Sequence, residues 1–364
     1  MSTKISILAI ALTTALSLAA RAGDLPPRLL VTLPADCNTP DGCTLDAAGN
    51  VILSIPNFNN AALRKAGTIQ TESRAKMVKI DSANRLSTWY EFKPADLHPV
   101  TGKVGPMDCA FGPDGNLYVA DNQMFFDPDH KSRLLRINVK DGQATSCDVV
   151  VEGFIVSNGI AWKGNTIYVS ETVLEKKTDG LVSGVYAIPM ADWKKGPTKL
   201  KPYQEGAADP RLIAVYKTSN RIGFGADGVV FDDAGNLYCS IFEDGILYQT
   251  TFDKKGKPSK PVLFAQDPKM ASADGLIFSN KDKCFFVADM LKNAVQKVDL
   301  QGKVETVHAN GDTNGADGSL DQPCEVLLRG RELIVVNMDM PWESDLLTNK
   351  KIDEPYTVSV IDLK

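Results

Sequence analysis

Acidic and amide side chains stand at the start of six similar segments of this sequence. Five segments begin with Asp or Asn, mostly followed by Gly, and the sixth begins with Cys324 and Glu325. The five residues are Asp41, Asp108, Asn158, Asp227 and Asp274. Carboxylate and amide oxygens are hard ligands, so a converging set would suit Ca²⁺ best, with Mg²⁺, Mn²⁺ or Zn²⁺ as alternatives. A single Asp-Gly pair is more often a turn that caps backbone amides, so the surrounding elements must decide between a site and a turn.

Each of these residues precedes the same kind of β-hairpin. The segments "DGVVFDDAGNLYCSI" (227–241) and "DCAFGPDGNLYVADN" (108–122) each place two apolar runs around an Asp/Gly/Asn turn. Related turns lie near residues 50, 165, 282 and 331, which makes the repeat roughly 45–70 residues long. Further strand-like runs lie between the hairpins, and amphipathic helical periodicity is hard to find.

Repeated four-stranded units are typical of a β-propeller, because each unit buries its faces only against its neighbours. The six units therefore predict an all-β, six-bladed β-propeller that forms a single domain over residues 23–364. Residues 28–33 and the last strand are expected to help close the ring, and residues 56–75 to form a loop. The first strand of each blade lines the channel, so the acids should meet at one rim. There they would repel one another unless protonated or neutralised, and a cation is the simplest neutraliser.

The first residues have the features of an export signal. Lys4 precedes an apolar run, and Ala20 and Ala22 fit a cleavage site before Gly23. We expect a signal peptide over 1–22 and a periplasmic or secreted protein without membrane contact after cleavage; an uncleaved N-terminal anchor is the alternative. Cleavage would remove two basic residues and no acidic one, so the net charge would move from −5 to −7.

Several partners and chemistries are not indicated. Basic residues are scattered, which disfavours a nucleic acid partner, and nothing indicates an oligomer, so a monomer is expected. The three histidines, His98, His130 and His308, do not start hairpins. No Gly-x-Ser-x-Gly segment accompanies them, so Ser/His/Asp hydrolysis is disfavoured.

The seven cysteines allow two interpretations. Export would place them in an oxidising compartment, where Cys37 and Cys43, which flank a Pro-Asp-Gly turn, are the first candidates for a disulfide. The alternative is that the cysteines are small buried hydrophobic residues. No Cys-x-x-Cys or His-x-x-x-His spacing indicates a zinc site.

Three segments carry a family resemblance: "SNGIAW" (157–162), "GADGVVFD" (225–232) and "DCAFGPDGNLYVAD" (108–121). With them the chain resembles the senescence marker protein/regucalcin/gluconolactonase family of six-bladed propellers, which is related to diisopropylfluorophosphatase and paraoxonase. The resemblance covers nearly all of the chain after the leader. It implies a small-molecule hydrolase of lactones or related esters, sometimes of phosphotriesters, with a divalent metal, usually calcium, at the top of the channel.

The resemblance also implies roles for single residues. The metal ligands would be Asp41, where Glu is more usual, Asn158 and Asp227. The second blade departs from the pattern, because Met107 stands where the family often has Asn, and a thioether is a poor calcium ligand.

Catalysis would rest on residues at the same rim. Asp227 is expected to serve as ligand and possible base, and Asp108 is the second choice for a catalytic carboxylate. Asp274 is expected to line the substrate pocket, and Asp121 and Asn122 to support its rim or contact substrate.

Two other functions stay open. A non-catalytic calcium-binding propeller that binds a ligand or a protein is favoured by Met107. A condensing enzyme like strictosidine synthase would need a carboxylate placed for an amine. The acidic loop 308–323 also has Asp312, Asn314 and Asp317 spaced somewhat like calcium ligands, yet it lacks the closing Glu of a calcium loop. A turn-rich connection is expected there.

Overall fold

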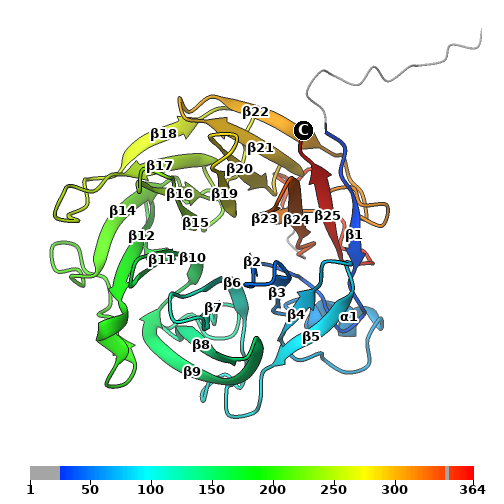
Figure 1. Ribbon diagram of the computed structural model, residues 1–364, viewed down its shortest axis with the longest axis horizontal. Helices are drawn as coiled ribbons and strands as arrows, with labels where there is room; N and C mark the ends of the chain where they lie inside the picture. Colours follow the sequence, from blue (N-terminus) through cyan, green and yellow to red (C-terminus); the bar gives the residue numbers. More distant parts are fainter. Residues whose placement is uncertain (1–24, 341–343) are drawn as a thin grey trace, which may run out of the picture.

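The protein is a ring of six β-sheets around a central channel (Figure 1). A computed structural model describes residues 25–340 and 344–364. The predicted all-β, six-bladed propeller is confirmed. The predicted signal peptide lies outside the described residues. Within the part described, no helix is long and apolar enough to cross a membrane.

The blades follow one another along the chain, and each runs from the channel outward. Blade 1 contains β2 (Cys43–Leu45), β3 (Val51–Ile55), β4 (Lys76–Ile80) and β5 (Leu86–Glu91). Blade 2 contains β6 (Pro106–Phe111), β7 (Leu117–Asp121), β8 (Ser132–Lys140), β9 (Gln143–Phe154) and, parallel to β9, β13 (Thr198–Lys199). Blade 3 contains β10 (Ser157–Lys163), β11 (Thr166–Lys177), β12 (Gly180–Pro189) and β14 (Leu212–Thr218).

The second half of the ring repeats this order. Blade 4 contains β15 (Ala226–Phe231), β16 (Leu237–Ile241), β17 (Ile246–Thr250) and β18 (Val262–Gln266). Blade 5 contains β19 (Leu276–Ser279), β20 (Cys284–Asp289), β21 (Ala294–Asp299) and β22 (Val304–Ala309). Blade 6 contains β23 (Pro323–Arg329), β24 (Glu332–Asn337), β25 (Thr357–Asp362) and β1 (Arg28–Thr32).

The ring is closed by pairing the two ends of the chain. The strand β1 is the outer strand of blade 6 and runs antiparallel to β25, with Arg28 opposite Val360. Arg28 also contacts Asp362 at 2.9 Å and Glu332 at 3.0 Å. The expected closure by both end segments is therefore confirmed. The segment 56–75, expected to be a loop, contains the short helix α1 (Asn60–Ala66), and a 3₁₀ turn, η1 (Met190–Trp193), follows β12.

The hairpin motif also supplies the packing between blades. In three blades a Tyr follows the turn by a few residues and meets an aromatic ring of the next blade. Tyr118 lies 4.8 Å from Trp162, and Tyr238 lies 4.3 Å from Phe285, measured between ring centroids. Such pairs stabilise beyond the area they bury. The repeated "Asn-Leu-Tyr" therefore joins blades as well as forming hairpins.

In five blades a buried polar side chain ends the second strand or follows it by two residues, and in blade 3 it precedes the irregularity within β11. Its oxygens accept hydrogen bonds from backbone N–H groups of the segment that leads into the first strand. The acceptors in blades 1 to 6 are Asn57, Asp121, Glu171, Glu243, Asp289 and Asn337. Buried backbone donors need such partners, so these six side chains, which we call the clamp residues, hold the start of each blade.

Two of the clamp residues each accept hydrogen bonds from two consecutive backbone N–H groups. Glu171 accepts from the N–H groups of Ile155 at 3.0 Å and Val156 at 2.6 Å. Asp289 accepts from the N–H groups of Ala271 at 3.0 Å and Ser272 at 2.9 Å. Burial raises the pKa of Glu171 to about 8, and the backbone hydrogen bonds oppose that shift.

The candidate disulfide is not formed. All seven cysteines lie in described residues and are free thiols, so the Cys37–Cys43 prediction is corrected. The two side chains have different surroundings: the Cys37 thiol contacts Asp36, whereas burial near the Glu325 carboxylate and the Cys109 thiol raises the pKa of the Cys43 thiol. Six of the seven are buried, as the alternative interpretation predicts.

The clamps can be tested by removing one. Replacing Asp289 by Ala removes the acceptor of the part-buried N–H of Ala271, the buried N–H of Ser272 and the side chains of Ser272 and Gln296. We therefore expect a loss of about 2–5 kcal/mol in the free energy of unfolding by urea. Asp299→Ala is the matched control, because Asp299 also accepts from two N–H groups, of Gln301 and Lys303, but in an exposed turn. Water replaces it there, so a cost below about 1 kcal/mol is expected. Equal losses in the two variants would contradict the role of the clamp.

Candidate metal centre and pocket

β-Bulges aim the first residues of four blades into the channel. In β15 the pairing passes from Ala226–Ile241 to Val229–Cys239, so Asp227 and Gly228 together oppose one residue. The strands β6, β10 and β23 have register shifts at the corresponding places. A bulge adds a residue to one strand and redirects a side chain. The local backbone thus turns Asp227 toward the axis of the ring.

Glycines next to the channel acids let neighbouring blades approach closely. A Cβ on Gly275 would lie 2.4 Å from Oε1 of Glu325, and a Cβ on Gly42 would lie 2.2 Å from the Cα of Asp108. Any side chain at these positions would collide with a neighbouring blade. Gly42 and Gly275, which follow Asp41 and Asp274, are therefore required for the close packing of the blades around the channel.

The predicted metal ligands meet at one pocket. Asp41, Asn158 and Asp227 line it together with Asp274, and each is between 6% and 8% exposed. Nδ2 of Asn158 donates to Oδ2 of Asp227 at 2.9 Å, which turns the amide oxygen away from that carboxylate. Asp274 is in hydrogen-bond contact with Asp227. Four residues from four blades therefore converge.

The channel carboxylates carry uncompensated negative charge. Burial raises the pKa of Asp227 to about 7 and that of Asp108 to about 7. Burial, and then the charges of neighbouring acids, raise the pKa values of Asp41, Asp274 and Glu325 well above their ordinary values. Among the described residues, no Lys, Arg or His lies within ion-pair distance of these five acids. The site must hold protons or a cation.

The donor set fits a divalent cation. Oδ2 of Asp41 is buried and has no hydrogen-bond partner. The other ligand candidates offer carboxylate or amide oxygens, which are the donors that Ca²⁺ prefers. Met107 also lines the pocket, so the second blade presents a thioether where an oxygen would be a better ligand.

Asp108 is already engaged in holding the backbone. Its Oδ1 accepts from the N–H of Cys109 and its Oδ2 from the N–H of Ile160, both at 2.6 Å. The second bond crosses from blade 2 to blade 3. This placement favours positioning of the inner strands over proton transfer at the pocket.

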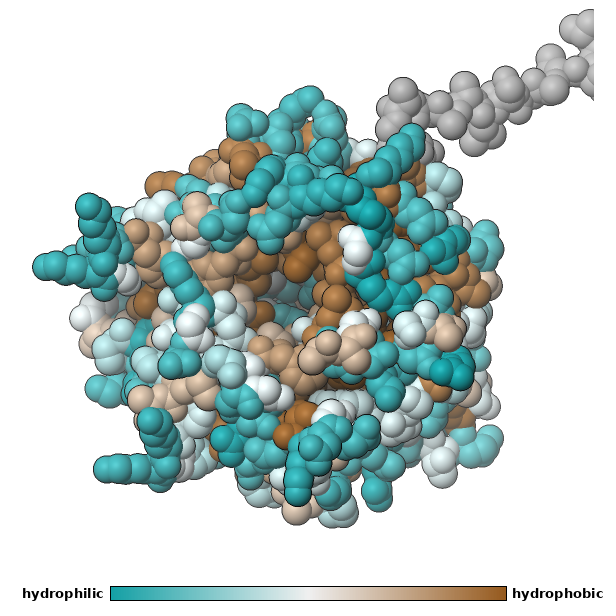
Figure 2. All heavy atoms as spheres, viewed as in Figure 1, coloured by the Kyte–Doolittle hydropathy of each residue, from teal (hydrophilic) through white to brown (hydrophobic). Residues whose placement is uncertain are grey.

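The pocket above the acids has apolar walls and a volume of about 320 Å³. Figure 2 shows hydrophobic residues around the central opening. The walls are formed by Met107, Val156, Met290, Met338, Met340, Phe125, Phe224 and Phe242. Sequence reasoning missed all of these except Met107. A signal was present, because Met290 and Met338 directly follow the clamp residues Asp289 and Asn337.

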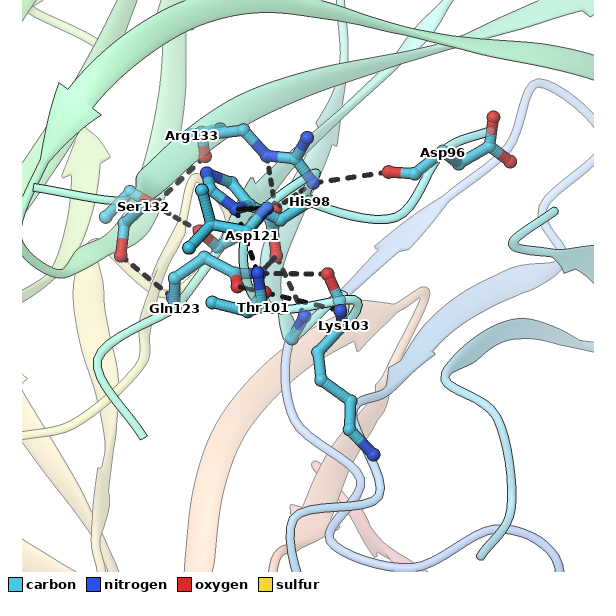
Figure 3. Close-up of polar contacts among 11 residues, drawn as sticks. Asp96, His98, Thr101, Lys103, Asp121, Gln123, Ser132 and Arg133 are labelled. Carbon is cyan, nitrogen blue, oxygen red and sulfur yellow. Dashed lines mark hydrogen bonds and ion pairs between the residues drawn. The ribbon is translucent and has the colours of Figure 1, made fainter. Parts of the chain in front are cut away.

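The neighbouring side chains of Asp121 and Asn122 lie in different surroundings. Asn122 lines the pocket, as expected. Asp121 is fully buried outside it, where Oδ2 contacts Arg133 at 2.6 Å and Oδ1 accepts from the N–H of Gly105 at 2.8 Å (Figure 3). Asp121 therefore does not line the substrate pocket, which corrects that placement, and of the two roles expected for it, support of the rim fits these contacts. The alternation of a strand sends neighbouring side chains to opposite faces, which explains why only one reaches the pocket.

The fold and this acidic channel define a six-bladed propeller with one deep pocket at the axis. Residues 60–270 match the SMP-30/Gluconolactonase/LRE-like region family. The match covers more than half of the chain, so the protein belongs to this family. No curated protein matches the sequence.

Solved structures of the same fold differ widely in sequence. A luciferin-regenerating enzyme is 13% identical, with a TM-score of 0.57 over 93% of this chain and 96% of the other. The PQQ-bound aldose sugar dehydrogenase of Streptomyces coelicolor is 15% identical, with a TM-score of 0.54 over 93% and 98%. At these identities the likeness concerns the fold alone.

The raised pKa values predict how the metal-free protein responds to pH. Asp227 and Asp108 titrate near 7 when folded and near 4 when unfolded, so the folded state binds more protons between these values. Their contribution to stability is complete below about pH 4 and is lost as the pH rises through 7. We therefore expect the Tm measured in EDTA to fall from pH 5 to pH 8.

The Asp227→Asn variant is the control for this experiment. It removes one of the titrating groups, so its Tm in EDTA should change less over the same pH range. Wild-type protein that is more stable at pH 8 than at pH 5 would contradict the assignment of buried, uncompensated acids in the channel.

Proposed function

We propose that the protein is a hydrolase of lactones or related esters that uses a divalent cation, preferably Ca²⁺, held by Asp41, Asn158 and Asp227. The observation that carries the proposal is the ring of uncompensated acids at the base of a deep apolar pocket. Membership in the SMP-30/Gluconolactonase/LRE-like region family supports the reaction class, and Asp41 Oδ2, buried without a partner, supports a bound cation.

The chain's own residues have distinct tasks in this proposal. A bound cation would supply Lewis acidity toward a carbonyl oxygen. Asp227 faces the pocket, so its carboxylate is placed to take a proton from a water molecule that attacks the substrate. The Nδ2 of Asn158 fixes one oxygen of Asp227 and thereby its orientation. Asp274 contacts the same carboxylate and can hold a proton there.

The walls favour an apolar substrate. Methionine side chains adapt to irregular apolar shapes, and four of them surround the acids with three phenylalanines. Polar groups are confined to the base and to Asn122. We propose a lactone or ester with an apolar substituent, which the walls would orient while they exclude bulk water.

Export is part of the proposal. Residues 1–22 have a basic start, an apolar run and small residues at the expected cleavage position, so the mature protein would act in the periplasm or outside the cell. A single propeller chain would carry the activity as a monomer, with no nucleic acid partner.

Asp227→Asn tests the catalytic role of this carboxylate once the channel site is saturated with Ca²⁺. At saturating Ca²⁺ we expect kcat on a panel of aliphatic lactones and aryl esters to fall by about 100-fold or more, because Asn cannot accept the proton. Asp233→Asn, an exposed acid in the turn of the same blade, should leave kcat unchanged. Full turnover by Asp227→Asn would sink the catalytic assignment. Absence of turnover by the wild type with Ca²⁺ bound would favour the non-catalytic calcium-binding propeller.

Met107→Asn should reveal whether the second blade can contribute a ligand. Met107 lines the pocket beside the predicted ligands, so an amide oxygen at this position adds a hard donor. We expect Ca²⁺ affinity, measured by calorimetry, to rise by about tenfold, equivalent to about 1.4 kcal/mol. Met290→Asn, on another blade of the same pocket, is the control. Equal affinities for wild type and Met107→Asn would place the second blade outside the metal centre.

A further inference from the structure

A second acidic cluster lies in blade 6, and none of its members lines the pocket. Asp321 precedes β23, Asp339 follows β24, and Asp353 lies on the return to β25. One oxygen from each side chain can be chosen so that all three lie within 4.8 Å of one another. Asp321 and Asp339 are each 1% exposed, and Asp353 is partly exposed.

The cluster leaves buried oxygens without partners. Oδ1 of Asp321 accepts from Nδ2 of Asn349 at 2.5 Å, and Oδ2 of Asp339 accepts from the N–H of Asp353 at 3.0 Å. The second oxygen of each, Oδ2 of Asp321 and Oδ1 of Asp339, has no hydrogen-bond partner, and Oδ1 of Asp353 has none either. Unpaired buried acceptors are costly, so these oxygens indicate a missing ligand.

The charges nearby do not neutralise the cluster. Within the described residues, no Lys, Arg or His lies within ion-pair distance of its three acids. The Asp312 carboxylate adds negative charge, and Lys351 contacts Asp312 at 3.6 Å from an exposed position. Burial and the neighbouring acids raise the pKa of Asp321 to about 8 and that of Asp339 to about 9.

We propose that Asp321, Asp339 and Asp353 bind a second divalent cation, Ca²⁺, that is separate from the channel site. Ca²⁺ binds oxygens at about 2.3–2.6 Å and so bridges ligands up to about 5 Å apart, whereas Mg²⁺, at about 2.0–2.1 Å, bridges about 4 Å. Three carboxylates can bring oxygens together here, which suits the flexible, carboxylate-rich coordination of Ca²⁺, whereas Mg²⁺ is usually held by one or two carboxylates. The partly exposed Asp353 provides the way in for the ion.

The site would hold one wall of the pocket. Asp339 lies between Met338 and Met340, both of which line the pocket. The same cluster joins the segment before β23, through Asp321, to the return segment that carries Asn349 and Asp353. A cation there fixes three chain segments that meet only in the folded blade, so its role is structural.

Calcium stoichiometry tests the proposal independently of the channel site. Titration calorimetry with Ca²⁺ alone should show that Asp353→Ala loses one bound ion. Asp345→Ala is the matched control, because Asp345 is a fully exposed acid in the same segment and should lose none. Asp227→Asn reports on the channel site separately. If the channel binds no Ca²⁺, Asp353→Ala should still bind one ion fewer than the wild type. Equal stoichiometry in Asp353→Ala and wild type would overturn the proposal.

Proteolysis gives a second, local readout on the intact protein. Lys350 and Lys351 are exposed beside the cluster, and Lys254 and Lys255 are exposed in a distant turn of blade 4. With Ca²⁺ at ten times its Kd, tryptic cleavage at the first pair should slow by about tenfold in the wild type. Cleavage at the second pair should not change. Cleavage at Lys350 and Lys351 that is insensitive to Ca²⁺, or equally slowed in Asp353→Ala, would count against the site.

Discussion

The clamp residues are the interaction on which the rest of the structure depends. The segment that leads into each blade approaches the channel before its first strand begins, so its backbone N–H groups lie outside the strand ladder. Glu171, Glu243 and Asp289 accept these hydrogen bonds from buried positions. Because an unpaired buried N–H is costly, the clamp determines where the next residues of the inner strand lie, and those residues form the site.

The same architecture concentrates negative charge at the axis. The clamps of three blades, together with the bulge in β15, bring Asp41, Asp227 and Asp274 to one pocket, and glycine at the following position allows the blades to approach closely. Burial makes ionisation of these acids unfavourable, and the apolar walls above them strengthen that effect. The channel acids therefore favour binding of protons or a cation. Without either, they lower the free energy of unfolding of the protein near neutral pH.

Blade 6 connects the wall of the pocket with the end of the chain. Its clamp residue, Asn337, is followed at once by Met338, Asp339 and Met340. The methionines face the pocket, whereas Asp339 joins Asp321 and Asp353. One short segment therefore couples the shape of the pocket to the acidic cluster that joins the last strands.

The sequence alone was sufficient to determine the repeat, the six blades and the positions of the first acids, because hairpin turns and alternating strands are local signals. The inner-strand acids could be placed at one rim because the propeller is regular. Only the tertiary structure distinguished Asn122 in the pocket from Asp121 beneath it, and it left Cys37 and Cys43 as free thiols. The cluster of Asp321, Asp339 and Asp353 also could not be predicted, because its members come from three separate segments that converge only when the last blade closes. Contacts of this kind depend on packing across the chain, which local patterns do not encode.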